Sequence, residues 1–155
     1  MHADVSMRLP GLEGLRVAVT AGAGGIGLCI ARTLKAQGAR LAICDVDEGA
    51  LVSVSTEIQP DVSEAADVSD EGDVERFFSA IKTKMGGLDA LVNNAGIAGP
   101  TGAIENISPA DWRRCIDICL TGQFLCGHFA VPLLKAAGGG AIINISSAAG
   151  RHGYA

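Results

Sequence analysis

The stretch that decides the fold is VTAGAGGIG, at positions 19–27. It overlaps the end of a short β-branched run, LRVAVT at 15–20, which is typical of a buried strand. It leads into residues 26–37, where apolar side chains recur at helical spacing. The expected inward face of that helix is formed by Ile26, Cys29, Ile30 and Leu34. The sequence therefore predicts a strand, a glycine-rich turn and a helix in direct succession.

The glycines of this turn indicate a phosphate-binding site. Gly22, Gly24 and Gly27 fit the pattern G-x-G-x-x-G, and the strand before them and the helix after them make the match specific. A diphosphate must approach the backbone closely, which excludes Cβ atoms, and a helix N-terminus offers free N–H groups and a partial positive charge. The alternative interpretation is a plain tight turn in which a glycine takes the left-handed conformation.

Asp45 is the second candidate for ligand binding. It ends the apolar run RLAICD at 40–45, twenty residues after Gly25. A carboxylate at this place accepts hydrogen bonds from an adenosine ribose and repels a 2′-phosphate, so it favours NAD over NADP. Asp45 could instead cap the helix expected at 47–58, and one side chain can do both.

The rest of the chain continues the alternation of strands and helices. Because the strands are continuous apolar runs, we expect a parallel sheet with helices on both faces and right-handed crossovers. The predicted fold class is α/β, a Rossmann-type doubly wound parallel sheet of about five strands. Residues 1–13 are expected to form a loose leader before one domain at 14–155. Beyond the second strand, the expected elements are a helix at 47–58, a strand at 62–67, a helix at 70–85, a strand at 88–93, a long helix at 108–136 and a strand at 141–146.

Composition argues against several classes of protein. The 155 residues are 48% hydrophobic and 19% charged, which is typical of a globular domain. The net charge is −5 and no basic run exceeds two residues, so we expect no nucleic-acid partner and no attraction to an anionic membrane. The N-terminus lacks an apolar signal segment, and the longest apolar stretch, 115–135, is too polar to span a membrane. We therefore expect a cytoplasmic protein.

The five cysteines favour a reducing compartment and no metal. They form no C-x-x-C pair, and each stands in an apolar context, so we expect small buried hydrophobic residues. Cys115, Cys119 and Cys126 share a helical face, but no His, Asp or Glu completes a ligand set there. No metal site is therefore predicted.

Two further motifs turn a general nucleotide-binding pattern into a family resemblance. NNAG stands at 93–96 and IINISSAAG at 142–150. Together with the glycine turn, Asp45 and the pair Asp67-Val68, they resemble the short-chain dehydrogenase/reductase family. Several motifs in the correct order and spacing make the resemblance specific, and it covers nearly the whole chain.

The resemblance implies coenzyme contacts at the ends of successive strands. The glycine turn would hold the diphosphate, residues 45–46 would flank the adenosine ribose, and residues 67–68 would contact the adenine. Residues 94–96 would line the cleft beside the ribose and nicotinamide. The expected coenzyme is NAD, and Asp45 disfavours NADP. With Gly22 added from the glycine pattern, the predicted contacts are Thr20, Gly22, Gly25, Ile26, Gly27, Asp45, Val46, Asp67, Val68, Asn94, Ala95 and Gly96.

Ser147 is the residue to which the resemblance gives a catalytic role. As the second serine of the pair at 146–147, it would hydrogen-bond the substrate oxygen. Ligands in sheets of this class bind beyond the carboxyl ends of the strands, where Ser147 is expected to lie. The alternative is a serine that only forms a turn. Asn93 is expected to be structural and to tie neighbouring strand ends together.

The activity implied by the resemblance is hydride transfer between a nicotinamide coenzyme and a small alcohol or carbonyl substrate. The full-length form is expected to be a homo-oligomer built on the helix at 108–136. The alternative is a non-catalytic nucleotide-binding module, or a pseudoenzyme that acts through its fold. A methyltransferase-like use of a similar fold is disfavoured, because the motifs at 93–96 and 146–147 have no role in one.

The chain departs from the family pattern at three places. Ala21 replaces a glycine, for which the adjacent Gly22 is expected to compensate. Cys119 stands where the family usually has an asparagine that helps hold a water in the proton relay, and a thiol is a poor substitute. The family's Tyr-x-x-x-Lys pair is absent, because Tyr154 is too close to Ser147 and no lysine follows it.

That missing pair would carry the chemistry. A tyrosine must give or take the hydroxyl proton, and its pKa must be lowered by a nearby lysine and the coenzyme's positive ring. We therefore expect the 155-residue chain to be a fragment that binds nucleotide and does not readily catalyse. The last predicted strand would then be an exposed apolar edge of the sheet.

Overall fold

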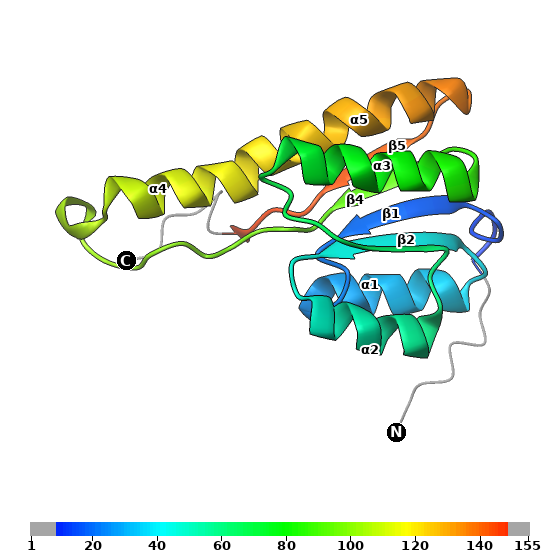
Figure 1. Cartoon of the computed structure of the whole chain (residues 1–155), viewed down its shortest axis with the longest axis horizontal. Helices are drawn as coiled ribbons and strands as arrows, with labels where there is room; N and C mark the ends of the chain where they lie inside the picture. Colours follow the sequence, from blue (N-terminus) through cyan, green and yellow to red (C-terminus); the bar gives the residue numbers. More distant parts are fainter. Residues whose placement is uncertain (1–8, 149–155) are drawn as a thin grey trace.

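Five parallel strands form one sheet, which lies between two layers of helices (Figure 1). The computed structural model describes residues 9–148, and within them the strand order is β3-β2-β1-β4-β5. Every neighbouring pair of strands runs parallel, which confirms the predicted Rossmann-type α/β fold. The strands are β1 (Arg16–Thr20), β2 (Arg40–Asp45), β3 (Val62–Ala65), β4 (Ala90–Asn93) and β5 (Ala141–Asn144).

Helices cover both faces of this sheet. In Figure 1, α1 and α2 lie on one face, and α3 and α5 lie on the other. The chain runs outward from β1 to β3 and then crosses back to β4 on the far side of β1, which opens the switch-point crevice where such sheets bind ligands. The helices are α1 (Gly25–Ala36), α2 (Glu48–Ile58), α3 (Glu71–Met85), α4 (Pro109–Ile116) and α5 (Gly122–Ala136). A 3₁₀ turn, η1 (Ile104–Asn106), precedes α4, and a π-helical turn, η2 (Asp117–Thr121), joins α4 to α5.

The side chains of each strand alternate between two cores. Val17 and Val19 pack in the cluster beneath α1 and α2, whereas Ala18 faces the cluster beneath α3 and α5. In the second cluster, Phe77 and Phe78 of α3 meet edge to face with ring centroids 5.4 Å apart. Both faces of the central strands are thus buried, which explains why their sequences are continuous apolar runs and not alternating ones.

The predicted inward face of α1 is wrong at its start. Ile26 is 65% exposed and Cys29 is exposed, whereas Gly27 and Ala31 are the buried residues of this helix. Small residues let the helix approach the sheet closely, so the backbone and not the large side chains makes the contact. The large apolar side chain of Ile26 is left to face the crevice.

Side-chain caps set the starts of three helices. Asp47, Asp70 and Ser108 each accept a hydrogen bond from a backbone N–H in the first turn of α2, α3 and α4. At the start of α4, Pro109 follows the Ser108 cap at the first helical position, where a proline is tolerated. The alternative role of Asp45 as the cap of α2 is wrong, because Asp47 caps that helix.

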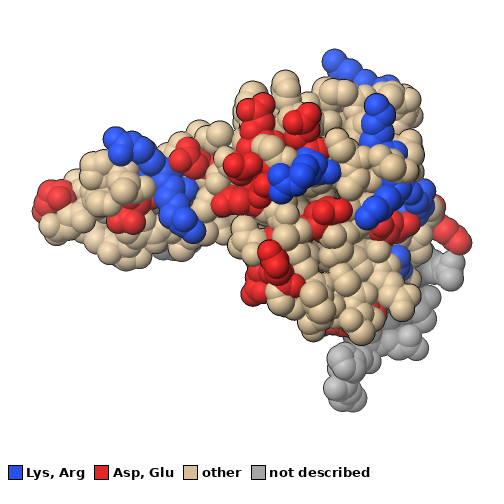
Figure 2. Space-filling view, viewed as in Figure 1, with Lys and Arg blue, Asp and Glu red and all other residues tan. Residues whose placement is uncertain are grey.

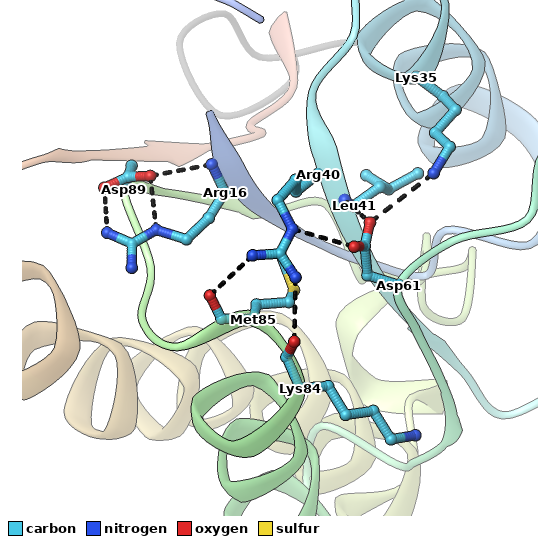
Figure 3. Close-up of polar contacts among 8 residues, drawn as sticks. All are labelled: Arg16, Lys35, Arg40, Leu41, Asp61, Lys84, Met85 and Asp89. Atoms are coloured by element: carbon cyan, nitrogen blue, oxygen red, sulfur yellow. Dashed lines mark hydrogen bonds and ion pairs between the residues drawn. The ribbon is translucent and has the colours of Figure 1, made fainter. Parts of the chain in front are cut away.

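Paired charges fasten the amino edge of the sheet (Figure 3). Arg16 at the start of β1 donates two hydrogen bonds to Asp89, at 2.8 and 2.7 Å. Arg40 at the start of β2 donates to Asp61 at 3.0 Å and to the two last carbonyls of α3 at 2.9 and 3.0 Å. A cation is favourable at a helix C-terminus, so Arg40 joins strand and helix electrostatically as well as by hydrogen bonds.

The long helix predicted at 108–136 is present, with a wider turn in its middle. Residues 117–121 form the π-helical turn between α4 and α5. By length and composition this helix could cross a membrane. Its α5 part nevertheless packs into the core beneath α3 through Leu125, Cys126, Ala130 and Leu134. The expectation that the chain crosses no membrane stays a prediction.

The two ends of the described chain differ in how they are held. At one end, Leu9 donates its backbone N–H to the side chain of Gln37 at 2.8 Å, so this part of the expected leader lies against the end of α1. At the other, β5 pairs with β4, and Ile142 and Ile143 are 40% and 43% exposed. Within residues 9–148, β5 is therefore the exposed apolar edge that the sequence predicts. The division into a leader and one domain stays a prediction.

The face shown in Figure 2 carries acidic and basic side chains in alternating groups. Acidic groups gather over the start of α3, where the first turn contains Glu71 and Asp73. The last turn of the same helix contains Lys82 and Lys84. This distribution complements the helix dipole. No broad basic patch lies on the described part of this face, and the expectation that the chain has no nucleic-acid partner stays a prediction.

Candidate active site

The glycine turn begins directly where β1 ends. Gly22 cannot carry a side chain, since a Cβ there would lie 2.8 Å from the side chain of Ile43. Gly27 is equally restricted, because a Cβ would meet the carbonyl of Ala21 and the amide of Asn94. Gly24, in contrast, faces open space. Two of the motif's glycines are thus required by packing within the protein, and the third leaves room for a ligand.

The N-terminus of α1 is open to an anion. Among the described residues, no side chain caps this helix, unlike α2, α3 and α4. Its N-cap residue is Gly24, and the first turn contains no acidic residue. Uncapped N–H groups and the helix dipole together make a site for phosphate oxygens.

Thr20 and Asn94 join the turn to the end of β4. The buried Thr20 hydroxyl accepts hydrogen bonds from the backbone N–H groups of Asn94 and Ala95, each at 2.9 Å. The Asn94 amide donates to the carbonyls of Thr20 and Ala21 at 3.0 and 3.2 Å. Both residues therefore lie at the predicted site. Their side-chain polar atoms are bonded within the protein and hold the turn in place, so these atoms are not the ones that would face a coenzyme.

Ala21 adopts a conformation that suits glycine. Its φ is +49°, in the left-handed region where a Cβ is disfavoured. The adjacent Gly22 does not relieve this, because its restriction is a close approach to Ile43. The replacement of the family's glycine by Ala21 therefore leaves strain in the turn.

Asp45 touches the glycine turn directly. Its carboxylate accepts a hydrogen bond from the backbone N–H of Ala23 at 3.0 Å and another from that of Asp47 at 3.2 Å. The next residue, Val46, is 69% exposed. The carboxylate therefore stands at the end of β2 beside the turn, as its predicted role toward a ribose requires.

A cavity of about 140 Å³ lies between Asp45 and the start of the long helix. Asp67 and Val68, from the loop after β3, form part of its wall, and the Asp67 carboxylate also accepts from the N–H and hydroxyl of Ser69 at 2.9 and 2.7 Å. The sequence missed Arg114 and Ile118, which line the cavity from α4 and η2. Their place at the cavity depends on which face of the long helix is turned toward the sheet, and this is seen only in the structure.

A second cavity of about 440 Å³ holds the predicted catalytic residue. Ser146 and Ser147 line it from beyond β5, and Ile26 lines it from the start of α1. Residues 95–97 line both cavities, so the two are separated only by this segment. The structure thus brings the predicted carboxylates and the predicted serine to one continuous edge of the sheet.

Cys119 lies in the wall of the second cavity. Its sulfur accepts a hydrogen bond from the Ile97 N–H at 3.3 Å and donates to the Ile97 carbonyl at 3.4 Å. The thiol thus provides a donor and an acceptor at the place where the family usually has an amide.

The five cysteines do not form one class. Cys44 and Cys126 are buried as expected, and burial raises the pKa of both thiols, that of Cys126 to about 12. Cys29 is exposed, so the expectation is wrong there. The face expected to unite Cys115, Cys119 and Cys126 is also divided, because Cys126 enters the core while the other two are half-buried beside residues 96–99. Within residues 9–148, no group of three or more potential ligands could hold a metal.

Asn93 has the structural role predicted for it. Its side-chain amide donates to the Asn144 side chain at 2.9 Å and so joins the ends of β4 and β5. The Asn93 side-chain oxygen is buried and has no partner among the described residues.

The sequence matches the short chain dehydrogenase family over residues 16–155. The chain belongs to the short-chain dehydrogenase family. This match covers the turn, both cavities and the strand ends that form them. Tyr154 lies outside the described residues, so the structure says nothing of its place.

Relatives within the family are dehydrogenases by name. The chain is 43% identical to a cis-4-hydroxycyclohexanecarboxylate dehydrogenase and 41% identical to a trans-4-hydroxycyclohexanecarboxylate dehydrogenase, both of Sinomonas cyclohexanicum, over 90% of this chain and 58% and 57% of theirs. It is 35% identical to a 2-dehydro-3-deoxy-L-rhamnonate dehydrogenase (NAD(+)) of Sphingomonas sp. strain SKA58, over 87% of this chain and 54% of the relative. The chain therefore spans little more than half the length of these curated relatives.

Proposed function

We propose that this chain binds NAD(H) along the carboxyl edge of its sheet, and that the protein containing it oxidises a small alcohol or reduces the matching carbonyl. The observation that carries this proposal is the pair of cavities separated by residues 95–97. One contains Asp45 and Asp67, which suit adenosine, and the other contains Ser147, which suits a substrate oxygen. The glycine-turn region lines both, with Ala21 at the first cavity and Ile26 at the second, so a dinucleotide bound across the turn would enter each.

The residues present fit this coenzyme. The uncapped start of α1 and the open space at Gly24 suit a diphosphate. Asp45 suits the two hydroxyls of an adenosine ribose, and its negative charge opposes a 2′-phosphate, which favours NAD over NADP. The contacts proposed for Ile26, Val46, Val68 and Gly96 follow from their places in the cavity walls.

The chemistry divides between the coenzyme and the chain. When bound, the nicotinamide ring supplies the hydride acceptor or donor. Ser147 holds the substrate oxygen by a hydrogen bond at the end of β5. Removal of the hydroxyl proton needs a base with a suitable pKa, and the sequence up to residue 155 contains no Tyr-x-x-x-Lys pair. We therefore propose that the 155-residue chain by itself binds the coenzyme without turnover.

The proposed substrate is a small ring alcohol. The two relatives at 43% and 41% identity are named for hydroxycyclohexanecarboxylates. The cavity that contains Ser147 has an apolar lining from Ile26, Ile97 and Ile145, which suits an alicyclic ring. In the protein that contains this chain, cyclohexanol is expected to be oxidised at least tenfold more efficiently than hexan-1-ol. Equal kcat/KM values would remove the ring from the proposal.

A titration with both coenzymes tests the binding proposal. The 155-residue chain is expected to bind NADH, measured by the fluorescence of the reduced nicotinamide, at least tenfold more tightly than NADPH. Ser147→Ala is the matched control, since it removes the proposed substrate contact and is expected to leave NADH affinity within about twofold. A folded chain that binds neither coenzyme would contradict the proposal.

A non-catalytic nucleotide-binding module is the second candidate function, and Cys119 in place of an asparagine favours it. Oxidation of any alcohol by the 155-residue chain with NAD would eliminate this candidate.

Two other expectations stay predictions, namely a cytoplasmic location and a homo-oligomer built on α4 and α5. Trp112, Leu120 and Phe124, which are 61–65% exposed along this helix, support the homo-oligomer.

A further inference from the structure

The segment that separates the two cavities has no regular secondary structure. Residues 94–100 follow β4 without strand or helical hydrogen bonding. One end of the segment is fixed, because Asn94 is bonded to Thr20 and Ala21 on β1 and the turn. A loop that forms a binding wall must also be held farther along, or it opens at little cost in free energy.

Cys119 provides that second attachment. Its thiol accepts from the N–H of Ile97 and donates to the carbonyl of the same residue, at 3.3 and 3.4 Å. One side chain thus satisfies both backbone groups of one residue, as a neighbouring strand would do. Ile97 itself lines both cavities, so this attachment holds the end of the shared wall that is farther from Asn94.

The π-helical turn aims the thiol at this wall. Residues 117–121 make the wider i→i+5 turn, which rotates α5 relative to α4. Within it, Ile118 lines the cavity of Asp45 and Cys119 lines the cavity of Ser147. Adjacent residues of one turn therefore serve different cavities, with Ile97 between them.

Cys115 lies one turn earlier against the same segment. A Cβ at Gly99 would be 3.1 Å from its sulfur, so the loop passes close to this thiol as well. Burial raises the pKa of the Cys115 thiol, and the charge and hydrogen bond of the neighbouring Cys119 raise it further. Cys115 therefore packs beside the loop and against Cys119, whereas Cys119 bonds to the loop backbone at Ile97.

We propose that Cys119 is a positioning residue that fixes residues 95–97 and thereby keeps both cavities in shape for the coenzyme. The proposal rests on the proposed coenzyme binding. Cys119 acts through the backbone of Ile97, so an amide, which also has a donor and an acceptor, replaces it, and an apolar side chain of similar size does not.

Hydrogen exchange at the Ile97 amide tests the attachment without any ligand. In the 155-residue chain, Cys119→Val is expected to raise the exchange rate of the Ile97 amide about tenfold relative to that of Val92 in β4. Cys119→Asn is expected to stay within threefold of the parent ratio, and Cys115→Ala is the control that removes the neighbouring thiol but keeps the bonds from Cys119 to Ile97. General destabilisation raises the exchange of the core amide of Val92 at least as much as that of Ile97, so it cannot by itself raise the ratio. Cys119→Ala, expected to match Cys119→Val, serves if valine prevents folding. An unchanged ratio in both apolar variants would overturn the proposal.

NADH affinity then tests the consequence for binding. Cys119→Val is expected to weaken NADH binding about tenfold, and Cys119→Asn to bind within threefold of the parent. Equal affinity in all three would overturn the role in shaping the cavities. If no form bound NADH, the proposed function would fail, and the Ile97 exchange ratio would still decide the attachment.

Discussion

The two edges of the sheet use charge in opposite ways. At the amino edge, Arg16 and Asp89 neutralise each other, and Arg40 bonds to Asp61 and to the end of α3. At the carboxyl edge, α1 begins without a side-chain cap. Asp45 stands there without an ion-pair partner among the described residues, bonded only to backbone N–H groups. Polar groups that are satisfied by each other stabilise the fold, and polar groups left for a ligand make a site.

Asp89→Ala is expected to produce the largest effect, at the amino edge. Asp89 accepts three hydrogen bonds from Arg16, one of them from its backbone, so truncation leaves a partly buried guanidinium unpaired. The free energy of unfolding is expected to fall by about 2–3 kcal/mol, measured by urea denaturation. Coenzyme affinity is expected to stay unchanged.

Glu57→Ala is the matched control for this pair. Glu57 pairs with Arg32 at the same 2.7 Å, but both side chains are about half exposed. Solvent screening weakens such an exposed pair, so Glu57→Ala is expected to lower the free energy of unfolding far less than Asp89→Ala does. If both truncations lowered the free energy of unfolding equally, the claim that the ion pair at the amino edge stabilises the fold more than a surface pair would be contradicted.

At the carboxyl edge, the expected effect is on coenzyme choice. Asp45→Ala combined with Val46→Arg removes the charge that opposes a 2′-phosphate and adds one that attracts it. The ratio of NADP to NAD affinity is expected to rise at least tenfold, which is about 1.4 kcal/mol, in a titration with each coenzyme. Asp47→Ala removes a neighbouring carboxylate that caps α2, so it should reduce stability and leave the ratio unchanged. A ratio that does not move in the Asp45 variant would refute the role of this carboxylate.

Acid should weaken the amino edge through the same pair. The hydrogen bond and charge of Arg16 hold the pKa of Asp89 below its ordinary value of 3.8. A lowered carboxyl pKa adds stability that is complete above the unfolded-state pKa and is lost as the pH falls through the folded-state pKa. The free energy of unfolding is thus expected to decrease from pH 5 toward pH 2 more steeply in the parent than in Asp89→Asn. Parallel pH profiles would show that the pair is not responsible.

The smallest expected effect is a gain. Ala21→Gly removes a Cβ from a left-handed position, which relieves about 1–2 kcal/mol, and adds backbone freedom to the unfolded chain, which costs about 0.5–1 kcal/mol. The net expectation is an increase in the free energy of unfolding of about 0.5 kcal/mol. A decrease in thermal stability would show that Ala21 is not strained.

The sequence predicted what depends on local chemistry. The order of elements and the glycine turn follow from residue types whose partners are close along the chain. Asn93 was also interpreted correctly, because the ends of neighbouring strands must meet at one edge.

The sequence could not show contacts that depend on how helices rotate. The exposed Ile26, the cavity positions of Arg114 and Ile118, and the bond from Cys119 to Ile97 join segments far apart in the chain. The π-helical turn has no clear signal in an apolar helical pattern, yet it decides which side chains reach the cavities. Nor could residue types tell that Thr20 and Asn94 would use their polar atoms on each other.

The most direct measurement follows the backbone amides of the 155-residue chain by NMR during an NADH titration. Binding of the diphosphate at the start of α1 predicts large shift changes for the amides of residues 24–27 and negligible changes for residues 86–89 at the opposite edge. Shift changes that saturate at residues 86–89, with the amides of residues 24–27 unchanged, would contradict the claim that the carboxyl edge and not the amino edge binds the coenzyme.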